Sequence, residues 1–594
     1  MPSARRLVVL TTVVLPLLLS ACDKKEDEAA VAAQKEADKA EAKTDDGRFS
    51  AEEGQMGAGA AAASPEPAPP AGEATPDKIN LGDGDDPLGG VLEEEADEEE
   101  PADEAHAGKV AETDKAADNS HSMIFEHYGV NPTIETTVTN LSTFAVDVDT
   151  ASYAMARSFL NKGEMPPEAS VRVEEIINYF DYLYTAPEDG DFSVHAEVVP
   201  SPQRIGYHVL RLGLKGKEVA VEARPSANLV FVVDISGSMA SGNRLGMVKD
   251  SLRLLVDELG SDDYVGIVAY GSKARVVLPP TTGAERDAIL AAIDGLRTEG
   301  STNVEAGLEL GYAQVAKQSL GAGINRVILC SDGVANTGAT KAEQILQKVA
   351  QHADRGITIS TIGVGMGNYN DTMMEKLANK GNGNYAYVDG LEEAKRVFVE
   401  HLTGTLQVIA KDVKLQLEFD KDVVARYRLL GYENRSLTAR DFSDDSKDAG
   451  EIGAGHTVTA LYEIKFKDPE ADKFGTLRIR YKRPRGTKSA LLEKPLPGTL
   501  IRDSYAEAAP PTRLSMVAAA YAEKLRGSYW VRNLTWDEIQ EMYDGIPLEL
   551  RETQEVAELG KLIGKAAALD ARSDKFEQDL PLAKMDFDRV PVLK

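Results

Sequence analysis

Hydrophobic and polar residues follow two patterns along this chain, and the middle of the chain has the clearer one. Residues 228–233 form a continuous apolar run, typical of a strand covered on both faces of a sheet. Residues 243–259 instead place leucines and valines on one helical face. Such patterns alternate to about residue 404, which predicts an α/β domain, residues 226–405, with a mostly parallel sheet and helices on both faces. The expected strands are 228–233, 264–269, 326–331 and 357–364, and the expected helices are 243–259, 284–296, 303–318, 341–354, 371–380 and 391–404.

On either side of this domain, apolar and polar residues alternate one by one, the period of a half-buried strand. Two such runs precede the domain and three follow it. We therefore expect residues 191–225 and 406–490 to form one β-sandwich into which the α/β domain is inserted. The runs are 192–199, 207–214, 413–419, 457–466 and 477–481.

Residues 123–190 predict a further α/β region, with a strand at 141–149 and helices at 151–160 and 171–180. Between the strand and the first helix lie Asp147, Asp149, Thr150 and Ser152. Four oxygen-bearing side chains so close together could hold a metal. Helix capping by Asp149 or Thr150, together with turn hydrogen bonds, explains the cluster more simply, and we favour that interpretation.

Residues 491–594 predict a small helical region, with helices at 514–525, 536–542 and 552–569. Trp530 and Trp536 flank the basic Arg532 in this region. We interpret the tryptophans as packing residues rather than as a surface for a partner.

The first 22 residues read as a secretory signal. A basic pair, Arg5 and Arg6, precedes an apolar stretch that is too short to span a bilayer comfortably. The stretch ends in Leu-Ser-Ala-Cys22, which resembles the bacterial lipobox, whose cysteine is acylated. The resemblance implies a lipid anchor at Cys22 and a place in the cell envelope. Asp23 also resembles an inner-membrane retention signal, but this rule varies among bacteria, so inner and outer membrane both remain open.

Residues 23–122 have the composition of a disordered acidic linker. Residues 23–120 contain 29 acidic and 9 basic side chains and hold most of the chain's net charge of −31. A segment with so few apolar side chains cannot offset the entropy lost on folding. We expect a solvated tether between the lipid and the folded domains. A nucleic-acid partner is not expected, because phosphate binding requires a basic surface.

Three polar loops of the α/β domain fall where ligands bind such folds, at the carboxyl ends of the strands. The candidate ligands are the carboxylates of Asp234 and Asp332 and the hydroxyls of Ser236, Ser238 and Thr302. Oxygen donors suit a hard cation such as Mg²⁺, with Mn²⁺ or Ca²⁺ as alternatives, and argue against zinc. The other cysteine, Cys330, lies in an apolar run and predicts a buried core thiol.

These five positions resemble, residue by residue, the metal-ion-dependent adhesion site of von Willebrand factor type A domains, which have a Rossmann-like fold. The resemblance implies that Ser236, Ser238 and Thr302 coordinate the metal directly and that Asp234 and Asp332 bind it directly or through water. It also implies one open coordination position, which an Asp or Glu of a protein partner fills.

Three further segments, 141–153, 171–180 and 450–462, resemble the bacterial YfbK-like proteins, in which a von Willebrand domain lies between an N-terminal region and a C-terminal domain. This resemblance covers roughly residues 120–590. It implies an architecture but little about function.

An adhesion or scaffold role is therefore the first functional hypothesis. No Walker A, His-Glu-x-x-His or Gly-x-Ser-x-Gly motif occurs, and no histidine lies near Ser236 or Ser238 in the sequence, so we expect neither an enzyme nor a small-molecule substrate. Two alternatives stay open. One is a regulatory partner of an ATPase, and the other is a structural envelope protein whose metal only stabilises the domain.

Overall fold

The structure, a computed structural model, describes residues 123–220, 223–333, 338–366, 369–401, 404 and 406–573. The predictions of a signal at 1–22, a lipid at Cys22 and a linker at 23–122 lie outside these residues. Among the residues that the structure describes, no helix is both long enough and apolar enough to cross a membrane.

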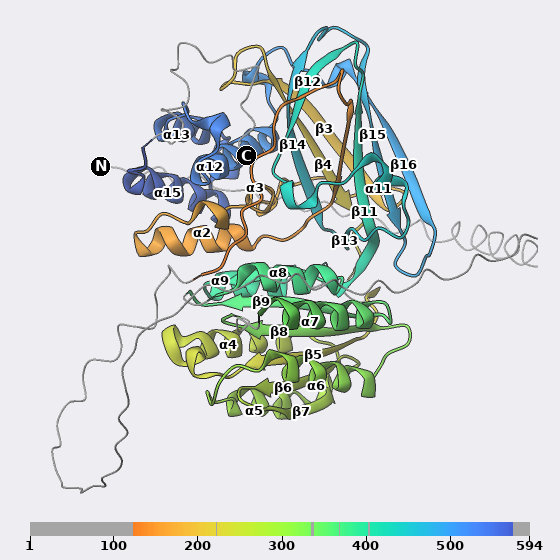
Figure 1. The fold of residues 1–594 in the computed structure, drawn as a ribbon, viewed down its shortest axis with the longest axis vertical. Coiled ribbons are helices and arrows are strands. Elements are labelled where there is room, and N and C mark those ends of the chain that lie inside the picture. Colours follow the sequence, from red (N-terminus) through yellow and green to blue (C-terminus); the bar gives the residue numbers. More distant parts are fainter. Residues whose placement is uncertain are drawn as a thin grey trace, which may run out of the picture. The chain divides into compact units, whose positions relative to one another are not determined.

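The central part of the chain forms an α/β domain with a six-stranded sheet in the order β10-β9-β8-β5-β6-β7 (Figure 1). Neighbouring strands are parallel except β7, which pairs antiparallel to β6 at one edge. The predicted mostly parallel sheet is therefore confirmed, and β7 and β10 are additions. The strands are β5 (Ala227–Asp234), β6 (Tyr264–Tyr270), β7 (Ala274–Thr282), β8 (Ile324–Ser331), β9 (Ile357–Val364) and β10 (Tyr385–Val388).

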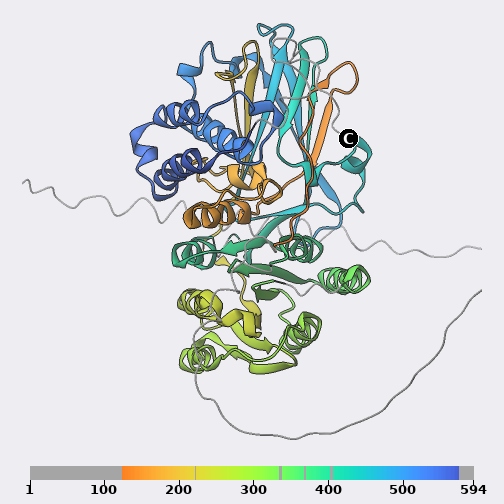
Figure 2. The ribbon, with the colours of Figure 1, turned by 60° about the vertical axis from the view of Figure 1, so that its left-hand side comes forward.

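Helices cover both faces of this sheet, as Figure 2 shows. Alternate residues of β5 enter two separate cores: Val230 and Val232 pack with α6, α7 and α8, whereas Leu229 and Phe231 pack with α4, α5 and α9. Two faces buried in this way explain the continuous apolar run in the sequence. The helices are α4 (Arg244–Glu258), α5 (Arg286–Gly295), α6 (Val304–Lys317), α7 (Gly338–Ala353), α8 (Asp371–Lys380) and α9 (Leu391–Lys395), with 3₁₀ segments at Gly237–Asn243 and Gly283–Glu285 and a π-helical turn at Arg396–Glu400.

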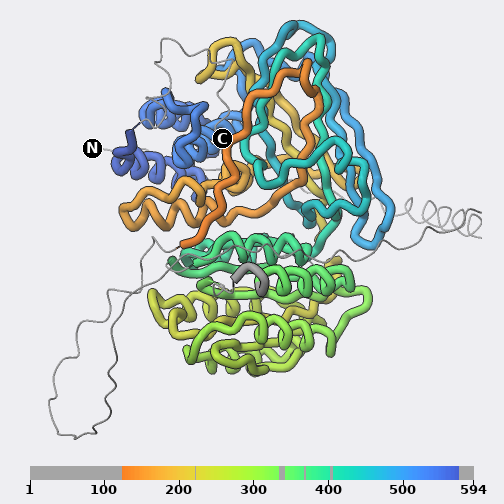
Figure 3. Tube along the Cα trace, viewed as in Figure 1, coloured from red at the N-terminus to blue at the C-terminus, as the bar shows by residue number. Residues whose placement is uncertain are grey.

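Two antiparallel sheets form the β-sandwich. One has the order β1-β12-β14-β4-β3 and the other β13-β11-β15-β16, with β2 also paired to β11. Because β4 pairs with β14, strands from before and after the α/β domain share one sheet, which confirms the inserted architecture (Figure 3). The strands are β1 (Ile134–Glu135), β2 (Leu141–Ala145), β3 (Phe192–Pro200), β4 (His208–Gly216), β11 (Val408–Phe419), β12 (Val424–Leu430), β13 (Gly450–Gly453), β14 (Thr457–Phe466), β15 (Lys473–Lys482) and β16 (Ser489–Pro497).

Residues 123–190 do not form a sheet of their own, because β1 joins one sandwich sheet and β2 joins the other. The first predicted helix is present as α2 (Ala151–Lys162), whereas the second is shorter than predicted, as α3 (Val173–Ile177) after a 3₁₀ turn at Glu168–Ser170.

The capping interpretation of the Asp147 cluster is partly wrong. Thr150 occupies the N-cap of α2, yet its side chain makes no capping hydrogen bond. Asp149 does not cap the helix either, because its Oδ1 accepts a hydrogen bond from the distant Tyr385 N–H at 2.9 Å. The predicted turn hydrogen bond is present, because the Asp149 N–H donates to Asp147 Oδ1 at 3.0 Å.

The predicted C-terminal helices pack with α2 and α3 in one core. Both tryptophans have internal partners, since the Trp530 indole N–H donates to the Asn131 carbonyl and that of Trp536 to Asp570. The helices are α12 (Pro510–Leu525), α13 (Trp536–Asp544), α14 (Leu548–Arg551) and α15 (Gln554–Leu569). The described part of the chain also has α11 (Ala439–Ser443) and 3₁₀ turns at Glu433–Arg435, Gly498–Leu500, Tyr505–Glu507 and Tyr529–Val531.

Candidate metal-binding edge of the α/β sheet

Three loops meet at the carboxyl edge of the α/β sheet, after β5, β6 and β8. β5 pairs in parallel with β6 on one side and β8 on the other, with Asp234 opposite Tyr270 and Val233 opposite Cys330. Asp234 is the last residue of β5, and Asp332 directly follows β8. Parallel pairing in this register therefore brings the two predicted carboxylates to one edge.

The loop after β5 folds back onto its own carboxylate. The Ser236 N–H donates to Asp234 Oδ1 at 2.8 Å, and the hydroxyls of Ser236 and Ser238 lie 3.1 Å apart. The Gly237 N–H donates to the Gly300 carbonyl at 3.1 Å, which ties this loop to the one before α6. Ser236 is buried and Ser238 is exposed, so the pair of hydroxyls reaches from the interior to the surface.

Thr302 is placed by its neighbours in the loop before α6. The Ser301 N–H donates to Ser272 Oγ at 3.0 Å, which fixes this loop to the turn after β6. Gly300 has a φ of 75°, and a Cβ there would lie 2.9 Å from the Ser272 backbone nitrogen. Only glycine fits this approach without strain. Thr302 itself is partly exposed at the same edge.

The Asp234 carboxylate is fully buried, with 0% of the residue exposed. Its Oδ2 accepts hydrogen bonds from Ser331 Oγ at 2.9 Å and from the Tyr270 hydroxyl at 3.3 Å. Burial raises the pKa of Asp234 above its ordinary value, and the charge of Asp332 acts in the same direction against hydrogen bonds from Ser236 and Ser331. A bound cation would relieve this cost of burying a charge.

Ser331 and Tyr270 were not among the predicted site residues. Each is the last residue of a strand that flanks β5, at the edge where the ligand loops begin. A polar residue that ends a neighbouring parallel strand is the signal that could have identified them.

Arg244, the first residue of α4, was also missed. Its Nη1 donates to Asp332 Oδ2 at 2.7 Å and to the Ser238 carbonyl at 3.3 Å, and its Nη2 donates to the Met366 carbonyl. The Arg244 and Asp332 side chains are only 7% and 6% exposed. The signal in the sequence was a cation at the start of the helix that follows the Asp-x-Ser-x-Ser loop.

The donors at this edge fit a hard divalent cation. They are oxygens only, and within the described residues no group of three or more His, Cys, Asp or Glu side chains could hold a metal. A metal here would therefore depend on hydroxyls and water as well as on two carboxylates, a combination that Mg²⁺ accepts. The residues that would hold it are Asp234, Ser236, Ser238, Thr302 and Asp332.

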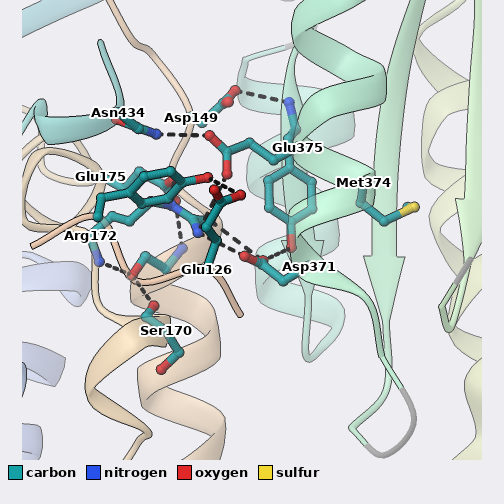
Figure 4. A network of polar contacts seen from close by, with 12 residues as sticks. Glu126, Asp149, Ser170, Arg172, Glu175, Asp371, Met374, Glu375 and Asn434 are labelled. Atoms are coloured by element: carbon teal, nitrogen blue, oxygen red, sulfur yellow. Dashed lines mark hydrogen bonds and ion pairs between the residues drawn. The ribbon is translucent and has the colours of Figure 1, made fainter. Parts of the chain in front are cut away.

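A buried polar network lies elsewhere, between the segment before α3 and α8 (Figure 4). Arg172 donates to Asp371 Oδ2 at 2.7 Å and to Glu175, and its Nη1 lies 3.6 Å from Glu375 Oε2. The Tyr385 hydroxyl donates to Asp371 Oδ1 at 2.5 Å. The three carboxylates share one guanidinium, and among the described residues no such cluster could hold a metal, so the network joins segments of the chain and is not a second candidate metal site.

Cys330 is buried, as predicted, at 1% exposure, and burial raises the pKa of its thiol to about 12. A thiol of this kind neither ionises nor binds metal at neutral pH. It packs among the residues that separate the sheet from α4 and α5.

The sheet order and the three loops define a von Willebrand factor type A domain. Residues 228–400 match the model of that domain, residues 119–211 match a model described as von Willebrand factor, and residues 404–569 match the C-terminal model of the uncharacterised protein YfbK. The predicted fold class is therefore confirmed. Domains of this type serve in general in protein interaction or adhesion, as modules without enzymatic activity.

The chain belongs to the YfbK family. It is 38% identical over 470 residues to the uncharacterised protein YfbK of Escherichia coli K12, a match that covers 74% of this chain and 80% of the relative. It is 27% identical over 298 residues to the uncharacterised protein sll0103 of Synechocystis, covering 49% of this chain and 70% of that one. A solved von Willebrand factor type A protein from Catenulispora acidiphila is 16% identical, with a TM-score of 0.40, and the match covers 65% of this chain and 91% of that structure.

Proposed function

We propose that this protein is a lipid-anchored envelope protein that binds a protein partner through a divalent metal, Mg²⁺ or else Mn²⁺ or Ca²⁺. The observation that carries the proposal is the convergence of two buried carboxylates and a pair of serine hydroxyls at one sheet edge, with Ser238 exposed. Two carboxylates only balance the charge of such an ion, so a carboxylate from a partner is a strong further ligand. The partner therefore offers an Asp or Glu side chain.

The residues of the edge have distinct roles in this proposal. Ser331 and the Ser236 N–H fix the orientation of the Asp234 carboxylate by hydrogen bonds of 2.9 and 2.8 Å. Such supporting bonds restrict a ligand to one geometry. Ser238 is exposed and Thr302 is partly exposed, so a partner could reach both residues.

The test compares partner capture from envelope extract by the wild-type protein and by Asp234→Ala, each with Mg²⁺ and with EDTA. We expect Asp234→Ala or EDTA to remove the captured protein while the fold remains. Asp262→Ala, an exposed aspartate next to the amino end of β6, is the matched control and is expected to behave as wild type.

Capture that is indifferent to both EDTA and Asp234→Ala would refute the proposal. A melting temperature that rises with Mg²⁺, with no captured protein at all, would instead favour the structural alternative.

The place of the protein is proposed from Cys22 and the residues around it, which resemble a lipobox. We expect radiolabelled palmitate to be incorporated by the wild-type chain and not by Cys22→Ser, and both chains to fold alike. Labelled protein would lie outside the cytoplasmic membrane, beyond the reach of a cytoplasmic ATPase. Absence of label from the wild-type chain would overturn the anchor and reopen the role of an ATPase partner.

A further inference from the structure

Arg244 places a fixed positive charge inside the candidate metal site. Its guanidinium donates to Asp332 at 2.7 Å and to backbone carbonyls of Ser238 and Met366, so it contacts loops after β5, β8 and β9. Both partners of the ion pair are more than nine-tenths buried. A charge held so far from water interacts strongly with any ion beside it.

The formal charges show what this cation does to a metal. Asp234 and Asp332 together carry −2, and Arg244 reduces the net charge of the edge to −1. A divalent ion would raise it to +1, with the ion and the guanidinium sharing Asp332. One carboxylate from a partner then brings the net charge to zero. Burying an uncompensated charge is unfavourable, so the neutral combination is favoured over the metal alone.

We propose that Arg244 is an internal counter-cation that weakens metal binding by the free protein and makes the metal and an acidic ligand bind cooperatively. This inference rests on the proposed function, because it concerns the same metal edge. If the two bind cooperatively, the metal occupies the site mainly when an acidic ligand is also present. Cooperativity of this kind is reciprocal, so the metal must tighten carboxylate binding by the same factor.

A purely structural role for Arg244 makes the opposite prediction. If the guanidinium only clamps the three loops, its removal loosens the ligands and weakens metal binding. If it competes for Asp332, its removal leaves a buried carboxylate without a counter-charge, and the metal binds more tightly. The direction of the change in affinity therefore separates the two roles.

The experiment is calorimetric titration of the full chain with Mg²⁺, with and without acetate as the carboxylate probe. We expect Arg244→Gln to tighten Mg²⁺ binding by about tenfold or more and to reduce the enhancement produced by acetate. Arg253→Gln, on the same helix α4 but in an exposed ion pair with Asp250, is the matched control and should leave both quantities unchanged.

A second variant, Gly365→Ala, moves the guanidinium without deleting it. A Cβ at Gly365 would lie 2.2 Å from Arg244 Nε, so the guanidinium must shift; the φ of 75° at Gly365 also strains the backbone of an alanine there, so the fold of this variant is checked by circular dichroism first. The same tightening is expected, and this variant decides the question if Arg244→Gln does not fold. Equal or weaker Mg²⁺ binding by the folded variants, beside a wild type that binds, would overturn the role of Arg244 and leave the proposed function intact. Absence of Mg²⁺ binding from every chain would overturn the metal site itself.

Discussion

At the scale of single residues, the buried carboxylates of this protein differ in the groups that compensate their negative charge. Asp234 is held by hydroxyls and Asp371 by a guanidinium. Glu451, in β13, is partly buried, and its buried Oε1 has no hydrogen-bond partner in the described structure. Burial raises the pKa of Glu451 to about 8, with Asp448 and Asp412 acting in the same direction and Arg326 against it.

A raised carboxyl pKa makes stability depend on pH with a defined sign. The unfolded chain loses the Glu451 proton near pH 4.5, whereas the folded chain keeps it to about pH 8. Between these values the folded state binds more protons than the unfolded state, so its stability falls as the pH rises. The stability that Glu451 retains below pH 4.5 is fully lost above about pH 8.

We therefore expect Glu451→Gln to be more stable than the wild-type protein at pH 8.5. The rise in pKa sets an upper limit of about 5 kcal/mol at roughly 1.4 kcal/mol per pKa unit, and partial exposure of the side chain reduces the difference below this limit. At pH 4.5 the two proteins should be equally stable. Denaturant unfolding at both pH values measures the difference. Glu470→Gln, at an exposed turn, is the control and should follow the wild type. A Glu451→Gln advantage that is the same at both pH values would contradict the assignment.

The sequence could place the five predicted ligand residues at one edge of the sheet because each lies beside a strand end or a helix start, where local patterns are informative. Asp234, Ser236 and Ser238 even lie within one short loop. The position of Arg244 at the start of α4 could be found in the same way, but the partners of its side chain could not. The side chain reaches Asp332 and Met366 across loops far apart in the sequence, and no spacing along the chain encodes that contact.

At the scale of helices and strands, elements with strong hydrophobic patterns were predicted well. The strands at 357–364 and 457–466 and the helix at 371–380 have the predicted bounds. Each contributes buried apolar side chains at regular intervals, which is the signal that periodicity detects.

Several strands that the sequence did not reveal have little apolar burial or little length, although β12, a seven-residue strand with Val424, Tyr427 and Leu430 buried, was also missed. β7 lies at the edge of its sheet and contains Pro279 and Pro280, and all its residues are partly or fully exposed. β10 and β13 have four residues each. An edge strand is held by backbone pairing on one side, so its sequence need not carry a pattern.

Helix α2 shows a second reason why sequence patterns fall short. Ala151, Ala154 and Met155 pack into the core of the α/β domain, whereas Tyr153 and Leu160 pack into the core of the C-terminal helices. Both faces of α2 are apolar because each packs into a different core. The helix was predictable, but the second neighbour was not.

At the scale of the whole molecule, α2 and the Arg172 network connect the α/β domain to the rest of the described chain. Arg172 comes from the segment before α3, while Asp371 and Glu375 come from α8. On the other side, the Asn434 amide donates to Glu375 Oε1 at 2.8 Å from the loop after β12. A change in the position of α8 must therefore disturb three parts of the chain together.

Arg172→Ala should accordingly lower the free energy of unfolding by about 3–5 kcal/mol, because it leaves Glu175, Asp371 and Glu375 buried without their shared cation. Adding Asp371→Asn to Arg172→Ala should recover part of the loss, since it removes one of the uncompensated charges. Arg253→Ala is the control: that arginine is 39% exposed, and an exposed pair contributes at most about 1 kcal/mol. Denaturant unfolding compares the four proteins. A loss from Arg172→Ala no larger than that of the control would mean that the network does not hold the α/β domain in place, and that other contacts do so, among them the apolar faces of α2 and the Arg157–Asp389 ion pair.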